Sequence, residues 1–238
     1  TTTATTPPTT APPTGTIQPA TAPPPTSPAP TAVASPGGYR LVGADGRTFG
    51  FGDAGPLDLV SANAGVASGS MVGPPETGEE ARRIFATNVD GVLNTVLPAM
   101  EAMRQQPPDR RGIRGRIAVM SSTAAFVAVP GAPAYCASKS AVDAWTVGNA
   151  QSARWEGIKL TSICPGYVRT PMTDMNRFPM PGLMEPERAA ALILRGVRNR
   201  SVRVTFPWWI GAAGRFGSLL PAGTTSLLMG RKGMVRDG

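Results

Sequence analysis

Short apolar runs alternate with helix-like segments between residues 55 and 206, and this alternation constrains the fold of the 238-residue chain more than any other feature. The runs have the length and apolar content of buried strands, and the segments between them repeat apolar residues at helical spacing. Strands that alternate with helices form parallel sheets with crossover helices, so we predict an α/β fold. The expected elements are, in chain order, the strand Leu57–Ala62, the helix Glu79–Gln106, the strand Ile117–Ser121, the helix Ala134–Trp155, the strand Ile158–Cys164, the helix Glu187–Arg198 and the strand Val202–Phe206.

Two segments of different composition precede this alternation. Residues 1–36 are mostly Thr, Pro and Ala and carry no charge. Such a segment cannot bury enough apolar surface to offset its ordering entropy, so we expect a disordered linker. In residues 37–54, Asp45-Gly46 separates two short β-prone runs, which predicts a hairpin. This second segment resembles one unit of a glycine-rich repeat of actinobacterial surface proteins. We therefore expect three parts, with an α/β domain over residues 55–238.

The chain has no histidine and two cysteines, Cys136 and Cys164. Histidine triads, histidine metal sites and histidine proton shuttles are therefore excluded, and acid–base chemistry falls to Tyr, Lys, Asp, Glu or Cys. The cysteines form no metal-ligand pattern, so we expect no metal site and two reduced, buried thiols. We find no signal peptide and no apolar run of the roughly 18–20 residues that span a membrane. Because the sequence starts at Thr1 without methionine, we interpret it as a processed product or a fragment.

The net charge of +8 is concentrated near the C-terminus. From Arg195 to Gly238 there are eight basic residues and one acid, Asp237, so this segment supplies +7 of the total. Apolar residues, among them Trp208 and Trp209, lie between these charges. A solvated basic face explains this composition as well as a contact with a membrane surface or a partner chain does. Nucleic-acid binding would depend on charge alone, and we expect none.

Tyr135 and Lys139 lie four residues apart near the start of an expected helix, which places them on one face, one turn apart. A lysine ammonium so placed can act on a phenol, whose ordinary pKa is about 10. Ser122 and Pro165-Gly166 each follow an expected strand. Chemistry in open α/β sheets is found at the carboxyl ends of strands, so these residues are expected to converge with Asn63-Ala64-Gly65. Each residue alone is more often a surface or turn residue, but their order and spacing together point to a site.

This combination of motifs resembles the classical short-chain dehydrogenase/reductase family. The resemblance covers residues 55–203, and the tail around Trp208 also looks like the C-terminus of some members. It implies an incomplete Rossmann-type parallel sheet with flanking helices. It also implies an oxidoreductase that transfers hydride between NAD or NADP and an alcohol or carbonyl. The motifs that carry the resemblance are Asn63-Ala64-Gly65, Asn88 in Thr87-Asn88-Val89, Ser122, Tyr135-x-x-x-Lys139 and Pro165-Gly166-Tyr167-Val168-Arg169-Thr170.

The resemblance also implies a role for each candidate residue. Tyr135 is the expected acid/base, Lys139 stabilises its phenolate and holds the nicotinamide ribose, and Ser122 binds the carbonyl oxygen. Asn88 is expected to hold a water that connects Lys139 to solvent. The cofactor-binding residues are expected to be Asn63, Ala64 and Gly65 near the adenosine ribose, Tyr135 and Lys139, and Pro165, Gly166, Val168 and Thr170 near the nicotinamide carboxamide. By contrast, we assign Glu76, Glu79 and Glu80 to the N-terminus of the helix that begins at Glu79, without a catalytic role.

One part of the family pattern has no counterpart in residues 1–54, namely the glycine-rich turn Gly-x-x-x-Gly-x-Gly with its strands and helices. In the family this turn and the following helix N-terminus hold the cofactor pyrophosphate. We therefore expect weak or no dinucleotide binding. The strand Leu57–Ala62 would also lack a neighbour and become a sheet edge, which predicts low solubility or a partner chain such as a second copy.

Three hypotheses follow for the function. The first is an NAD(P)-dependent oxidoreductase, and the second is a non-catalytic truncated or fused protein derived from a reductase. The third is a peripheral membrane protein that acts through its basic C-terminal segment. For the first hypothesis we expect an apolar small-molecule substrate, because Thr173–Met184, the family's substrate lid, is rich in Met, Phe and Leu. The reductase part indicates the cytoplasm, with or without membrane association, whereas the Thr/Pro-rich linker is typical of exported proteins.

Overall fold

A computed structural model describes residues 39–42, 48–51, 56–67, 76–129, 131–174, 176, 179–199 and 201–221. The expected linker, residues 1–36, and the expected turn at Asp45-Gly46 lie outside the described residues. The strands on either side of that turn are described. β1 (Tyr39–Val42) and β2 (Thr48–Phe51) pair antiparallel, with Tyr39 opposite Phe51. The predicted hairpin pairing is therefore confirmed.

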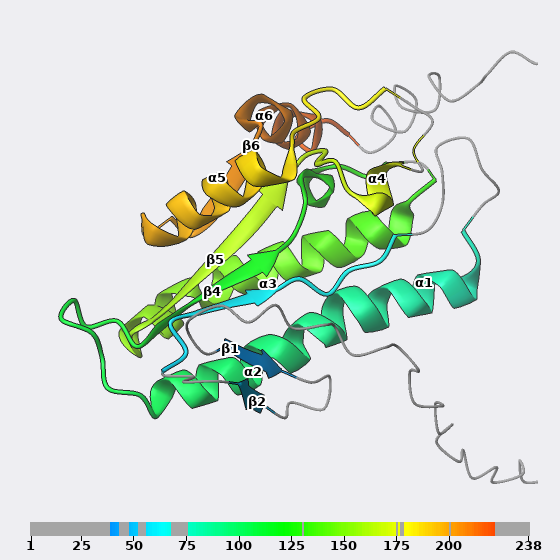
Figure 1. Ribbon diagram of the computed structural model, residues 1–238. Coiled ribbons are helices and arrows are strands. Elements are labelled where there is room, and N and C mark those ends of the chain that lie inside the picture. Colours follow the sequence, from blue (N-terminus) through cyan, green and yellow to red (C-terminus); the bar gives the residue numbers. More distant parts are fainter. Residues whose placement is uncertain are drawn as a thin grey trace, which may run out of the picture. The chain divides into compact units, whose positions relative to one another are not determined.

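The other described strands form a four-stranded parallel sheet in the order β3-β4-β5-β6 (Figure 1). Each strand pairs in register with the next: Val60 lies opposite Ile117, Ile117 opposite Leu160, and Ile163 opposite Val204. The predicted α/β class and parallel sheet are confirmed. The strands are β3 (Leu59–Ala62), β4 (Gly115–Met120), β5 (Ile158–Pro165) and β6 (Arg203–Phe206).

The three predicted helices are found at the expected positions, whereas the short helices η2 (Thr123–Phe126) and α4 (Pro171–Asp174) fall in segments that were expected to be loops. The expected helix Glu79–Gln106 contains a π-helical turn, in which the Gly91 amide donates to the Ala86 carbonyl five residues earlier. A helix that was not expected, α6, begins directly after β6. None of the described helices is both long enough and apolar enough to cross a membrane. The helices are α1 (Gly78–Phe85), the π-helix η1 (Ala86–Asp90), α2 (Gly91–Arg104), the 3₁₀ helix η2 (Thr123–Phe126), α3 (Pro133–Trp155), α4 (Pro171–Asp174), α5 (Pro186–Arg198) and α6 (Trp208–Gly217).

Different helices cover the two faces of the sheet (Figure 1). Successive residues of a strand point to opposite faces. In β4, Ile117 and Val119 pack with residues of α2 and α3, whereas Ala118 packs with residues of α5. This two-sided burial explains why the expected strands are continuous apolar runs without polar alternation.

Strand β3 lies at an edge of the sheet, and among the described strands it pairs with β4 alone. Val60 and Ala62 are buried under α2, whereas Leu59, on the other face, is 42% exposed. The expected sheet edge is therefore present within the described residues. An edge strand offers unpaired backbone groups to another strand, and an exposed leucine beside them favours such a contact.

We predict that the 238-residue chain self-associates through this edge. Size-exclusion chromatography with light scattering should show species larger than a monomer. The substitution Leu59→Lys should shift the distribution toward monomer, because a charged side chain at a sheet edge opposes pairing. Leu194→Lys is the matched control, since Leu194 is about as exposed but lies on α5, and it should leave the distribution unchanged. A monodisperse wild-type monomer would contradict the prediction.

Candidate active site

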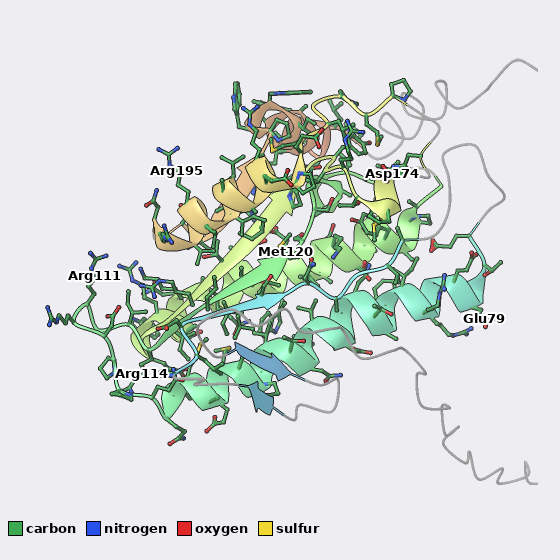
Figure 2. The ribbon with its side chains drawn as sticks, in the orientation of Figure 1. Glu79, Arg111, Arg114, Met120, Asp174 and Arg195 are labelled. Atoms are coloured by element: carbon green, nitrogen blue, oxygen red, sulfur yellow. The ribbon has the colours of Figure 1, made fainter. Side chains whose placement is uncertain are left out.

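The candidate residues lie at the carboxyl ends of β3, β4 and β5, as the parallel sheet requires. Asn63-Ala64-Gly65 directly follows β3, Ser122 lies two residues beyond β4, and Pro165 ends β5. Figure 2 shows Met120 at this end of β4, with α3 running beneath it. The sheet topology therefore gathers segments that are up to about a hundred residues apart in the sequence.

Tyr135 lies in the first turn of α3, and the Ser122 side chain lies close enough to its phenol to act on its pKa. Ser122 is buried, and its Oγ accepts a hydrogen bond from the Ala124 amide at 3.1 Å, as the N-cap of η2. Burial raises the pKa of Tyr135 above its ordinary value, while the Ser122 side chain acts in the opposite direction. The free protein therefore holds Tyr135 as a neutral phenol at neutral pH, ready to donate a proton.

Lys139 lies one turn after Tyr135 and is 4% exposed. Its Nζ donates to the Met120 carbonyl at 2.9 Å and lies 5.9 Å from the centre of the Tyr135 ring. Within the part of the chain that the structure describes, no carboxylate forms a salt bridge with it. Burial lowers the pKa of Lys139 to about 8 because the ammonium loses its hydration. At neutral pH it is still largely protonated.

The backbone at Gly65 lies against the Lys139 amine. A Cβ on Gly65 would lie 3.2 Å from Nζ and 3.8 Å from Asn88 Oδ1, so a side chain here would crowd both groups. Ala64 packs into the core beside Gly91, and Asn63 is exposed. This close approach is a physical reason for glycine at the third position of Asn63-Ala64-Gly65.

Asn88 is fully buried in the π-helix. Its Oδ1 accepts from the Val66 amide at 2.7 Å, and its Nδ2 donates to the Val66 carbonyl at 2.9 Å and to Ser138 Oγ at 3.0 Å. Ser138 Oγ in turn donates to the Tyr135 carbonyl at 2.8 Å. Asn88 therefore joins the loop after β3 to the first turn of α3, a structural role that the sequence does not reveal.

The N-terminus of α3 receives a carboxylate from another part of the chain. Glu76 Oε2 accepts from the Ala134 amide at 3.0 Å, whereas the N-cap residue, Ala132, makes no side-chain capping bond. The expectation that Glu76 serves the helix beginning near Glu79 is therefore wrong. At α1 the capping box is formed by Thr77 and Glu80, as expected for Glu80. A contact between residues 58 apart leaves no periodic signal in the sequence.

The segment from Pro165 to Thr170 forms a loop beside β6. The Gly166 amide donates to the Phe206 carbonyl at 2.7 Å, Val168 forms a β-bridge with Met184, and the Thr170 amide donates to Thr173 Oγ1 at 2.9 Å. Tyr167 belongs to this loop. Its phenol acts electrostatically on Tyr135 and adds to the increase in the pKa of Tyr135 that burial causes.

Asp143 and Arg203 form a buried network behind the site that was not expected. Asp143 lies one turn after Lys139, and its carboxylate accepts from Ser162 Oγ at 2.6 Å and from Arg203 Nε at 2.8 Å. Burial alone would raise the pKa of Asp143, but the hydrogen bonds from Arg203 and Ser162 hold it below its ordinary value. Arg203, which belongs to the basic C-terminal segment, is thus an internal ion-pair partner that ties β6 to α3. Tyr135, Lys139 and Asp143 follow one another at intervals of four residues, so they lie on one face of the helix. This spacing is the sequence signal that could have indicated a role for Asp143.

The two cysteines are free and buried, as expected. Burial raises the pKa of Cys164 to about 11 and also raises that of Cys136. Both are therefore protonated thiols at neutral pH and poor nucleophiles.

Comparison with known proteins identifies relatives of this arrangement. A family model described as short chain dehydrogenase matches residues 51–179, more than half of the chain, and this range contains every candidate site residue. An uncharacterized oxidoreductase of Myxococcus xanthus is 36% identical over 169 residues, which are 71% of this chain and 64% of that protein. The oxidoreductase UcpA of Escherichia coli is 32% identical over 190 residues, or 77% of this chain and 65% of UcpA. This chain thus spans slightly less than two thirds of each relative's length.

A solved structure is similar as well. The crystal structure of a short-chain type dehydrogenase/reductase from Mycobacterium marinum superimposes with a TM-score of 0.51 and 28% sequence identity. The superposition covers 63% of this chain and 63% of that protein. The similarity therefore extends to the fold as well as the sequence.

We predict that Lys139→Met stabilises the protein at pH 7. The folded-state pKa of about 8 lies about 2.5 units below 10.5, and at about 1.4 kcal/mol per unit the buried ammonium costs roughly 3 kcal/mol below pH 8. Loss of the bond to Met120 returns about 1 kcal/mol, so the free energy of unfolding should rise by about 2 kcal/mol.

Denaturant unfolding between pH 7 and pH 10.5 measures this effect. Over pH 8–10.5 the unfolded lysine keeps a proton that the folded one has lost, so wild-type stability should rise with pH relative to the variant. Groups that do not interact with Lys139 contribute equally to both proteins, so the difference reports the titration of Lys139 together with its action on Tyr135 and Cys164. Parallel pH curves would contradict the prediction.

Proposed function

Because this chain belongs to the short-chain dehydrogenase family, we propose that it is an oxidoreductase that transfers hydride between a nicotinamide dinucleotide and an alcohol or carbonyl compound. The observation that carries the proposal is that the Tyr135 phenol has Ser122 beside it and the buried ammonium of Lys139 5.9 Å from the centre of its ring. A chain without histidine needs another proton donor for such a reaction, and a buried neutral phenol is suited to it.

Tyr135 and Ser122 act together on the oxygen of the substrate. In reduction, the Tyr135 hydroxyl gives its proton to the carbonyl oxygen as the carbonyl carbon gains the hydride; in oxidation, the phenolate removes the proton of the alcohol. Ser122 donates a hydrogen bond to the same oxygen and holds it in place. The dinucleotide, when bound, supplies or accepts the hydride.

Lys139 stabilises the phenolate that forms when Tyr135 has given up its proton. Its Nζ lies 5.9 Å from the centre of the Tyr135 ring, so the positive charge is placed to attract the negative charge that develops on the phenol oxygen. Because no described carboxylate neutralises Lys139, its charge acts on Tyr135 without competition. Burying the ammonium destabilises the folded protein, but the same buried charge stabilises the phenolate during the reaction.

The residues around Lys139 are suited to the nicotinamide end of a dinucleotide. An ammonium has three donors, and one is bound to the Met120 carbonyl, so further donors remain for ribose hydroxyls. The absence of a side chain at Gly65 keeps the space beside Nζ open. We assign the carboxamide to the loop of Pro165, Gly166, Val168 and Thr170, and the adenosine ribose to Asn63 and Ala64. Whether the dinucleotide is NAD or NADP depends on contacts beyond these residues.

The substrate we propose is a small, apolar alcohol or carbonyl compound. The segment before α5 contributes the half-buried Met180 and Leu183, and Met172 on α4 is exposed. These side chains offer a flexible apolar surface and few hydrogen bonds, which favours a substrate recognised by its shape and its reacting oxygen.

A non-catalytic function is the second candidate, and it is favoured by one observation. The described residues include no glycine-rich turn that leads into a helix, the arrangement that anchors a pyrophosphate. Binding would then depend on the nicotinamide end alone. In that case the chain would act as a reductase-derived protein without turnover.

We predict that Tyr135→Phe lowers turnover by a factor of about 10²–10⁴, the usual contribution of a positioned acid or base. Reduction of a panel of apolar aldehydes and ketones at saturating NADH and NADPH measures it. Ser122→Ala should also lower turnover, while Ser152→Ala, an exposed serine on α3, should leave it unchanged. Wild-type rates in Tyr135→Phe would overturn the assignment of the acid/base.

We further predict dinucleotide dissociation constants well above the micromolar range. Titration of NADH and NADPH followed by fluorescence measures them, with Gly65→Val as the variant that fills the space beside Lys139 and should weaken binding further. Micromolar affinity would contradict weak binding. Neither binding nor turnover at any concentration would favour the non-catalytic function.

A further inference from the structure

Helix α6 turns its largest apolar side chains toward solvent. Trp208 is 76% exposed and Phe216 is 72% exposed, and Leu219, just beyond the helix, is 79% exposed. Trp209 and Leu220 are also exposed. At about 100° per residue, Trp208, Trp209 and Phe216 lie within one arc of about 100° on the helix surface, and Leu219 and Leu220 follow the end of the helix. We call these five side chains the outer face of α6.

The opposite side of α6 is made of glycine. Gly211 and Gly214 are buried; a Cβ on Gly214 would lie 3.0 Å from Phe126 Cβ, and one on Gly211 would collide with the Thr205 side chain. A surface helix of a globular protein normally packs its bulky apolar residues inward and exposes polar ones. α6 does the reverse, so packing against the described part of the chain does not account for the aromatic residues of the outer face.

The glycine side holds α6 firmly to the domain. Phe126, which α6 covers, is buried, and the Arg215 guanidinium lies 4.7 Å from the centre of its ring. The Arg203 guanidinium, paired with Asp143, lies 5.6 Å from the same ring. These contacts fix the position of α6 on the domain, and with it the direction of the outer face.

The C-terminal part of the sequence carries an excess of positive charge. The sequence contains no acidic residue between Glu187 and Asp237, and nine basic residues lie in that interval. Of these, Arg203 is paired internally with Asp143, while Arg195 projects from α5 into solvent (Figure 2). Exposed Trp, Phe and Leu side chains on a segment with an excess of positive charge are complementary to anionic headgroups above an apolar layer.

We propose that the outer face of α6 binds the surface of an anionic phospholipid bilayer. Trp208, Trp209, Phe216, Leu219 and Leu220 insert at the boundary between headgroups and acyl chains, and the excess positive charge of residues 188–236 attracts the anionic headgroups. This contact is independent of the proposed oxidoreductase chemistry, because it uses no residue of the candidate active site.

Co-sedimentation of the full chain with vesicles tests the proposal. The protein should bind vesicles of phosphatidylcholine and phosphatidylglycerol, bind phosphatidylcholine alone far less, and lose binding as salt concentration rises. The combined variant Trp208→Ser/Phe216→Ser/Leu219→Ser should lower the partition coefficient by about a thousandfold, since each lost side chain accounts for about tenfold or more. Trp155→Ser, which removes an equally exposed tryptophan from the end of α3, is the matched control and should bind as the wild type does.

A second measurement guards against loss of folding in the combined variant. In the full chain carrying Trp145→Phe and Trp155→Phe, emission comes from Trp208 and Trp209, and it should shift to shorter wavelength when anionic vesicles are added. Unchanged emission, or equal binding of the combined variant and the wild type, would overturn the proposal. So would light scattering that shows a dimer dissociated by the combined variant, together with no vesicle binding, because a second copy would then be the occupant of the outer face.

Discussion

The buried ammonium of Lys139 is the interaction on which the rest of the site depends. A charged amine inside a protein is costly, and here no described carboxylate compensates for it. It is accommodated by the Met120 carbonyl at the end of β4 and by the bare backbone of Gly65 after β3. Both neighbours are strand ends of the same sheet, so the parallel order of β3 and β4 creates the place where the amine can lie.

Helix α3 must be held firmly for this placement to persist, and it is fastened along its length by other segments. Glu76 binds its N-terminus, Asn88 binds Ser138 in its second turn, and the Ser121 hydroxyl donates to the Lys139 carbonyl at 2.9 Å. Further along, Asp143 is paired with Arg203 of β6. Removing one partner of such a buried pair typically costs about 3–5 kcal/mol, so this pair also fixes the position of β6.

The same contacts relate the active-site side of the sheet to the C-terminal helix. Phe126 ends the 3₁₀ helix that Ser122 caps, and α6 packs over Phe126 with its glycines. Arg203 and Arg215 both lie over the Phe126 ring. The residue that α6 packs against, Phe126, therefore belongs to the same short helix that Ser122 caps. The outer face of α6 carries none of the candidate residues.

Most of the fold follows from local sequence patterns. The bounds of α3, β5 and α5 agree with the prediction to within one residue, because apolar periodicity and flanking prolines mark them directly. The π-helical turn at Asn88 and the helix α6 were not predicted. A single extra residue in a helical turn leaves the apolar pattern nearly intact, and α6 lacks an inward-facing apolar stripe because glycines occupy that side.

The sequence by itself determined the α/β class, the convergence of Ser122, Tyr135 and Lys139 at one end of the sheet, and the concentration of positive charge near the C-terminus. Those properties depend on residue type and spacing, which the chain carries locally. Only the tertiary structure decided the partners of Glu76, Asn88, Asp143 and Arg203, the fit of Gly65 against Lys139, and the outward direction of the aromatic side chains of α6. Each of these depends on which distant segment packs beside a residue. Burial removes water from a charged group, and the neighbouring segment then determines whether that group has a charged partner, as Asp143 has, or none among the described carboxylates, as for Lys139.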